Sequence, residues 1–226
     1  MRFPYKYGGF FFLTALIVLT PWVVSAHTIN YALEKSPATD VVWYYFKLGV
    51  GHILPLGIDH ILFVISLCLL STRVKTILWQ ATAFTVAHSV TLALSMKNIL
   101  FVPGAIVEPV IALSIVFVAV ENILIRELKK WRVGIVFLFG LVHGLGFASA
   151  LNEIGLPRNK FYTSILSFNA GVEIGQIIVI LAVFTLVILP LGRKEGYRKF
   201  IVNPTSGTIA LLAAYWVVKR SLLLPG

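Results

Sequence analysis

The residues best suited to chemistry in this sequence are three histidines inside long apolar segments: His60, His88 and His143. Each lies 11 or 12 residues from one polar end of its segment. At about 1.5 Å of rise per helical residue, the imidazoles lie roughly 16–18 Å from that end. Half of a hydrocarbon core is about 15 Å. Asp59 precedes His60 and shares its depth, so the spacing predicts three imidazoles and a carboxylate near one level.

Such a cluster has a definite chemistry. Ionisable groups inside a bilayer are costly, normally face the bundle interior and are candidates for function. Imidazole is a common ligand of zinc, copper, nickel and iron, and a carboxylate completes many mixed sites or orients an imidazole through a hydrogen bond. The alternative is that the histidines only form interhelical hydrogen bonds with serines and threonines. Three histidines at one depth beside an aspartate favour a metal or proton-handling site.

Two further residues extend the candidate site. His52 lies about two helical turns before His60, and Glu173 shares one helical face with Asn169 and Gln176 through i, i+4, i+7 spacing. We expect His52 and Glu173 to lie toward the outer surface. Glu173 is either a metal ligand on the uptake side or a member of an interhelical hydrogen-bond network.

The Glu121 carboxylate is expected at the cytoplasmic surface. Glu121 lies five residues before Arg126, at the end of an apolar segment. We interpret it as a boundary charge that pairs with Arg126, or as the last ligand of a transport path.

The composition requires a membrane to position these residues. Hydrophobic residues make up 58% of the 226 residues and charged residues 12%, against about 45–50% and about 25% in soluble domains. A membrane helix needs about 20 apolar residues. The predicted fold is therefore an all-α polytopic bundle of six transmembrane helices, at about 49–70, 76–96, 103–125, 133–151, 162–191 and 205–222.

The first residues indicate a secretory signal peptide. Arg2 and Lys6 precede an apolar run, and small residues end it at Ala26. We predict a signal peptide at 1–26 (alternatively an uncleaved first helix), a short periplasmic segment at 27–48 and a transmembrane domain at 49–222. Cleavage would make His27 the amino terminus, where the amine and imidazole together could chelate copper.

The basic residues predict the orientation. With residue 27 outside, ten lysines and arginines fall in the cytoplasmic breaks and seven on the other side, as the positive-inside rule requires. The expected location is the bacterial inner membrane, with both mature termini in the periplasm. The net charge of +10 is then explained by these breaks, so no nucleic-acid partner is expected.

Three motifs resemble those of the HupE/UreJ membrane proteins. They are GHILPLGIDHILF at 51–63, FTVAHSVTL at 84–92 and FGLVHGLGFA at 139–148. Six residues rather than five separate His52 from Asp59, and the third motif lacks a downstream His-Gly-x-Glu, as in a second, less characterised branch. The resemblance implies a histidine-carboxylate metal site, and some members are regarded as nickel permeases.

Two classes of function remain open from the sequence. The first is a transporter of a nickel-type divalent cation, with ligands at several depths. The second is an intramembrane metal-dependent enzyme, such as a zinc hydrolase, with three histidine ligands and an open position. The predicted metal residues are Asp59, His60, His88, His143, His52 and Glu173. The predicted partners are the metal ion (nickel, zinc or copper) and the lipid bilayer, and a homo-oligomer is an open alternative to a single copy of the chain.

Overall fold

The structure is a computed structural model that describes residues 30–222. The predicted signal peptide and His27 lie outside the described residues. Within 30–222 the chain is helical and contains no strand. The main helices are α2 (Tyr31–Glu34), α3 (Ala38–Ile53), α4 (Ile58–Leu69), α5 (Val74–Met96), α6 (Gly104–Leu124), α7 (Arg132–Ile154), α8 (Phe161–Val183), α9 (Leu189–Leu191) and α10 (Asn203–Leu222).

The helix lengths confirm the predicted fold class. In the described residues, five helical stretches are long and apolar enough to cross a membrane, and α3 with α4 makes a sixth if the bent pair is one span. One stretch runs from Arg158 to Leu191 and joins α8 to α9 through a π-helical turn at Phe184–Ile188. Another begins at Arg198 and continues into α10. The protein is therefore a multi-pass membrane protein.

The first span differs from the expectation of one continuous helix at 49–70. α3 begins at Ala38 and ends at Ile53, and α4 leaves the break at an angle of 68°. Pro55 causes the break, because it lacks an N–H group and disfavours helical geometry in the preceding residue. Leu54 is accordingly extended, and the Gly51 carbonyl accepts instead from the Leu56 N–H at 3.4 Å.

Gly57 allows the break to close tightly. A Cβ at this position would overlap the carbonyl oxygen of His52. The first turn of α4 can therefore lie directly against the last turn of α3. The two helix ends that carry His52 and His60 are held together by this contact.

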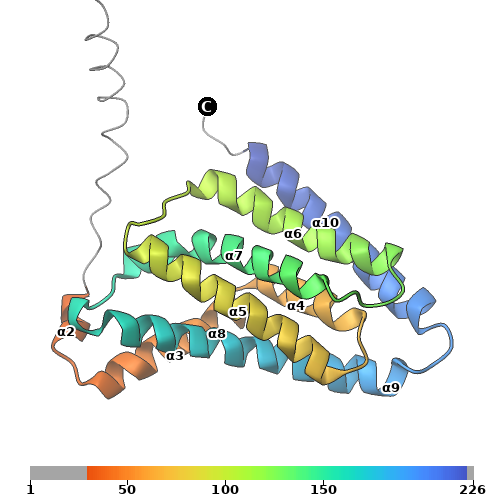
Figure 1. Ribbon diagram of the computed structural model, residues 1–226, viewed down its shortest axis with the longest axis horizontal. Helices are drawn as coiled ribbons and strands as arrows, with labels where there is room; N and C mark the ends of the chain where they lie inside the picture. Colours follow the sequence, from red (N-terminus) through yellow and green to blue (C-terminus); the bar gives the residue numbers. More distant parts are fainter. Residues whose placement is uncertain (1–29, 223–226) are drawn as a thin grey trace, which may run out of the picture.

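The helices associate in three close pairs. α3 lies beside α8, α5 beside α7, and α6 beside α10 (Figure 1). Small residues set the spacing of the first two pairs, because a Cβ at Gly49 would overlap the backbone of Phe168 and one at Gly144 that of His88. This is the packing of helices that lack a strong hydrophobic drive to associate in lipid.

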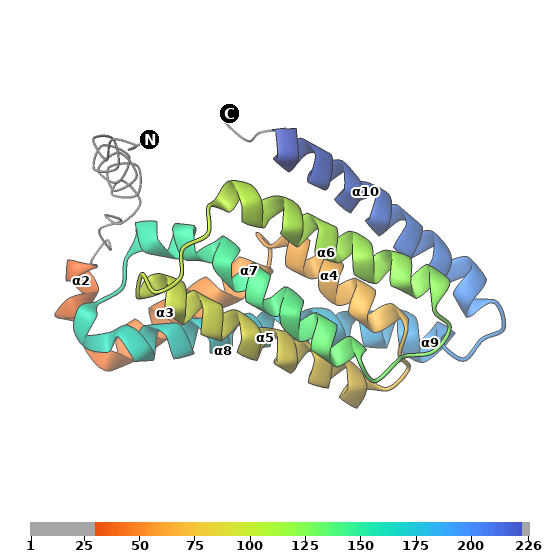
Figure 2. The ribbon, with the colours of Figure 1, turned by 45° about the horizontal axis from the view of Figure 1, so that its top comes forward.

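α4 lies between two apolar clusters. One cluster is built largely from α3, α5 and α8, and includes Val64 and Cys68 of α4. The other joins α6 and α10 to the bundle through Phe63 and Leu67 of α4. Turning the molecule shows α6 and α10 forming one edge of the bundle (Figure 2). α4 and α7 are thus the elements through which the α6–α10 pair contacts the remaining helices near the histidines.

Candidate metal centre

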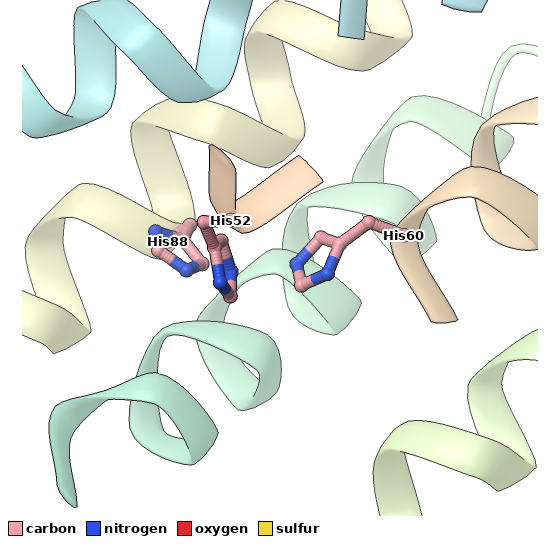
Figure 3. Close-up of side chains that lie close together, drawn as sticks. All are labelled: His52, His60 and His88. Atoms are coloured by element: carbon pink, nitrogen blue, oxygen red, sulfur yellow. The ribbon is translucent and has the colours of Figure 1, made fainter. Parts of the chain in front are cut away.

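Three histidines from three helices converge in the interior of the bundle. His52 lies in the last turn of α3, His60 in the first turn of α4 and His88 in α5 (Figure 3). One potential ligand atom from each lies within 4.8 Å of the other two. Zinc–imidazole bonds are about 2.0–2.1 Å long, so two ligand nitrogens on opposite sides of one ion are about 4 Å apart. Small side-chain rotations would bring the three nitrogens around one ion.

The break between α3 and α4 places His52 in this trio. The sequence placed His52 nearer the outer surface, because eight residues of straight helix would separate it from His60 by about 12 Å. In the structure the two ring centroids are 4.6 Å apart. The bend therefore moves His52 from the expected flank of the site into its centre.

Asn169 fixes the ring orientation of His88. The Asn169 amide nitrogen donates to the Ile165 carbonyl at 2.9 Å, so its oxygen faces His88 Nδ1 at 3.2 Å. That oxygen can only accept a hydrogen bond, and His88 therefore carries its proton on Nδ1. His88 Nε2 is buried and has no hydrogen-bond partner among the described residues. Its lone pair is available as a metal ligand, in the arrangement that metal-binding histidines normally show.

A second chain of hydrogen bonds fixes His60. The Ser114 hydroxyl donates to the Ile111 carbonyl at 2.6 Å and therefore accepts from His143 Nε2 at 3.0 Å. His143 Nδ1 is then the acceptor for His60 Nε2 at 3.4 Å. The remaining lone pair of His60 is on Nδ1. In this arrangement His143 orients the His60 ring, whereas the sequence grouped His143 with His60 and His88 as a metal ligand.

A cavity of about 950 Å³ leads to the histidines from one end of the bundle. Its lining includes the rings of His52, His60 and His143, together with the non-helical residues Leu56 and Gly57. Irregular backbone at membrane depth is tolerated where it lines such a cavity. We call this end of the bundle, where α6 begins and α7 and α10 end, the cavity side.

Asp59 is held by an arginine that the sequence did not connect with the site. Arg220 of α10 donates two hydrogen bonds to the Asp59 carboxylate, at 2.8 and 3.1 Å. Both side chains are 22% exposed, and both line the cavity. A carboxylate inside a membrane span needs a counter-ion. The position of Asp59 in the sequence therefore already indicated that a basic side chain pairs with it.

Glu173 lies outside the histidine trio. Its Oε1 accepts from the Thr82 hydroxyl of α5 at 2.6 Å, and the neighbouring Gln176 oxygen accepts from Thr85 at 3.2 Å. Thr82 precedes His88 by six residues, or about 9 Å of helix, toward the end opposite the cavity. Glu173 is thus beyond the histidines as seen from the cavity, whereas the sequence placed it toward the uptake side.

Glu121 does not pair with Arg126 as expected. It forms an ion pair with Arg132 at 3.3 Å, and the two side chains are only 3% and 1% exposed. Arg132 also donates to Asn122 Oδ1 at 3.1 Å, and Asn122 donates to the Ser66 carbonyl at 2.7 Å. Arg132 begins α7 and folds back against the end of α6, so the tertiary contact replaces the local one. We call Glu121, Arg132, Asn122 and Ser66 the buried network.

Comparison with known proteins gives the family. The sequence model of the HupE / UreJ protein family matches residues 13–220, nearly the whole chain. This protein belongs to the HupE/UreJ family. The resemblance drawn from the three motifs is therefore confirmed. Searches for curated relatives and for similar solved structures found no match.

Proposed function

We propose that this HupE/UreJ protein is a transporter of a nickel-type divalent cation, and that the cation binds to His52, His60 and His88. The observation that carries the proposal is the convergence of three imidazole ligand atoms within 4.8 Å in the bundle interior. The hydrogen bonds of Asn169 and His143 support it, because they direct one lone pair of His88 and one of His60 away from their protein partners. The family is associated with nickel and cobalt transport.

The ligand chemistry suits an ion that must leave again. Imidazole binds nickel, cobalt, zinc and copper but holds them less tightly than thiolate ligands do. Cys68 is buried in an apolar cluster and is absent from the histidine trio. Three neutral nitrogen donors would hold a divalent cation, while the charged groups lie around them rather than among them.

The path begins in the cavity. An ion entering there reaches His52 and His60 first and then His88, with Asp59 beside His60 at the cavity wall. We assign Glu173 to the next step, because its Oε2 is buried without a hydrogen-bond partner among the described residues and its carboxylate lies beyond His88. The buried network must open or be bypassed before the ion can leave.

The orientation follows from the charges at the two ends. The links opposite the cavity side carry many basic residues: Arg73, Arg126, Lys129, Lys130, Arg193 and Lys194. By the positive-inside rule this end is cytoplasmic. The cavity then opens to the periplasm of a bacterial inner membrane, on the side where α3 begins and α10 ends (Figure 1).

Flux through the purified full-length protein in liposomes tests the proposal. A metal-sensitive dye inside the liposomes would report uptake of Ni²⁺, Co²⁺ and Zn²⁺, and isothermal titration would give their affinities. We expect His88→Ala to abolish flux and the main binding event. The matched control is Trp79→Ala, which removes a larger ring from an exposed position on the same helix. Equal flux through the parent and His88→Ala proteins would exclude a path through the trio.

One observation favours a second candidate, an intramembrane zinc-type enzyme. A trio of histidines, of which His52 and His60 line a cavity of about 950 Å³, resembles a catalytic zinc site with three ligands and one open position. Such an ion would lower the pKa of its bound water to about 7. The same experiment separates the candidates: one tightly retained ion without flux favours the enzyme, and exchangeable binding with flux favours the transporter.

A further inference from the structure

Arg220 occupies both oxygens of the carboxylate next to the histidine trio. Its two Nη atoms make parallel hydrogen bonds to Asp59 Oδ1 and Oδ2, across 161 positions of sequence. Bidentate arginine–carboxylate pairs have a fixed geometry, and their charge-assisted hydrogen bonds are stronger than hydrogen bonds between neutral groups. While this pair is intact, each Asp59 oxygen already accepts one hydrogen bond, and the positive guanidinium opposes a second cation at this carboxylate beside His60.

Arg220 also has a second acceptor within reach. Its Nη1 lies 3.3 Å from the Glu108 carbonyl oxygen, and the Glu108 side chain lines the same cavity. The guanidinium carbon lies 5.3 Å from the centre of the Trp216 ring. The arginine can therefore leave Asp59 and still keep an acceptor and an aromatic contact.

The cavity makes this exchange physically accessible. Asp59 and Arg220 are each 22% exposed and both border the cavity. Water and ions can reach the pair, so breaking it does not leave two charges in an apolar interior. A cation reaching His60 passes directly beside the carboxylate.

We propose that Arg220 is a positioning residue that competes with the transported cation for Asp59. This inference rests on the proposed function and states what controls cation binding at that site. Without the cation, Arg220 neutralises Asp59. When a divalent cation binds the trio, Asp59 turns to the cation, and Arg220 keeps its hydrogen bond to the Glu108 carbonyl and turns toward the Glu108 carboxylate. A monovalent cation offers Asp59 no more charge than Arg220 does, whereas a divalent cation offers twice as much, so the competition selects for divalent ions.

Affinity measurements on four variants test the competition. Arg220→Gln removes the competitor, and we expect the Kd for Ni²⁺ to fall by roughly three- to tenfold. Arg220→Lys keeps the charge without the planar fork and should give an intermediate Kd. Asp59→Asn should weaken binding. Lys219→Gln is the matched control, because it removes the same charge from the neighbouring exposed position and should leave the Kd unchanged.

The double variant Asp59→Asn, Arg220→Gln separates exchange from simple repulsion. If Arg220 acts through Asp59, the gain from Arg220→Gln must be smaller in the Asp59→Asn background than in the parent. An equal gain in both backgrounds would overturn the proposal, as would weaker binding by Arg220→Gln itself. Should Arg220→Gln fail to fold, Arg220→Lys carries the same comparison.

A direct measurement needs no substitution. A guanidine-directed dicarbonyl reagent labels free arginines, and peptide mass spectrometry reports the rate at Arg220. We expect saturating Ni²⁺ to raise that rate, with the exposed Arg193 as an unchanged internal reference. An unchanged rate at Arg220 in protein that binds Ni²⁺ would overturn the exchange while leaving the proposed function standing. Failure of the parent to bind any metal would instead remove the proposed function.

Discussion

Two ion pairs connect helices at opposite ends of this bundle, and their surroundings differ sharply. Asp59 and Arg220 join α4 to α10 beside the cavity, and each is 22% exposed. Glu121 and Arg132 join α6 to α7 at the other end, where they are 3% and 1% exposed. The first pair is reachable by water, whereas the second is enclosed by Asn122, Ser66 and apolar residues.

The difference in burial separates an exchangeable contact from a permanent one. A partly exposed pair contributes little net stability, because water solvates the separated charges well. A buried pair also contributes little against an apolar replacement, but removing one partner leaves an unpaired charge in the interior. We therefore expect the cavity-side pair to exchange partners readily and the buried network to stay intact.

The largest expected effect comes from breaking the buried pair on one side only. Arg132→Met leaves Glu121 without its partner, and we expect the free energy of unfolding to fall by about 3–5 kcal/mol. Denaturant unfolding of the detergent-solubilised protein measures the change. In the double variant Glu121→Leu, Arg132→Met, most of the loss should be recovered. A single-variant cost below about 1 kcal/mol would show that the buried pair behaves like the exposed one.

The next effect tests the helix break that brings His52 into the histidine trio. Gly57→Ala places a methyl group against the His52 carbonyl, and we expect a loss of about 1–3 kcal/mol from overpacking together with weaker Ni²⁺ binding. Gly51→Ala is the matched control, since a Cβ there meets no atom within 4 Å. Equal affinities for the two variants would mean that the tight break is not needed for the trio.

A smaller change in stability is expected at the cavity-side pair. Asp59→Asn should alter the free energy of unfolding by at most about 1 kcal/mol, because both partners are partly solvated. The same substitution should weaken Ni²⁺ binding, which titration would measure. A stability loss like that of Arg132→Met would show that the pair is structural and would remove the contrast.

The smallest effect is the response to salt. Raising the ionic strength from about 0.05 M to about 0.5 M shortens the screening length from roughly 14 Å to roughly 4 Å. The difference in stability between the parent and Asp59→Asn should then shrink by a few tenths of a kcal/mol. The corresponding difference for Arg132→Met should stay constant. Similar salt dependence for both differences would indicate that water also reaches the buried network.

Most of the fold could be predicted from the sequence, because apolar length and helical rise are local properties. They indicated the six spans and the common depth of His60, His88 and His143. The first span was the exception, and Pro55 and Gly57 marked the reason within the sequence itself. The size of the bend, 68°, depends on how α3 packs against α8 and α4 against its neighbours.

The candidate site was predictable in part. Residue type and depth pointed to the histidines and to Asp59. The division of labour among the histidines was not predictable, because it depends on which nitrogen each ring turns toward its partner. His143 meets Ser114 and His60, so it orients the His60 ring; His52 becomes a member of the trio only after the bend.

By itself the sequence determined that this chain spans a membrane and shares its motifs with the HupE/UreJ family, and it predicted that three imidazoles lie at one level. Hydrophobicity, helical rise and motif spacing act along the chain, and they suffice for those conclusions. Only the tertiary structure decided the partners of the charges. Arg220 reaches Asp59 across 161 positions and Arg132 takes Glu121 from the expected Arg126, because a charge in an apolar interior pairs with whichever opposite charge the packing of the helices brings within reach.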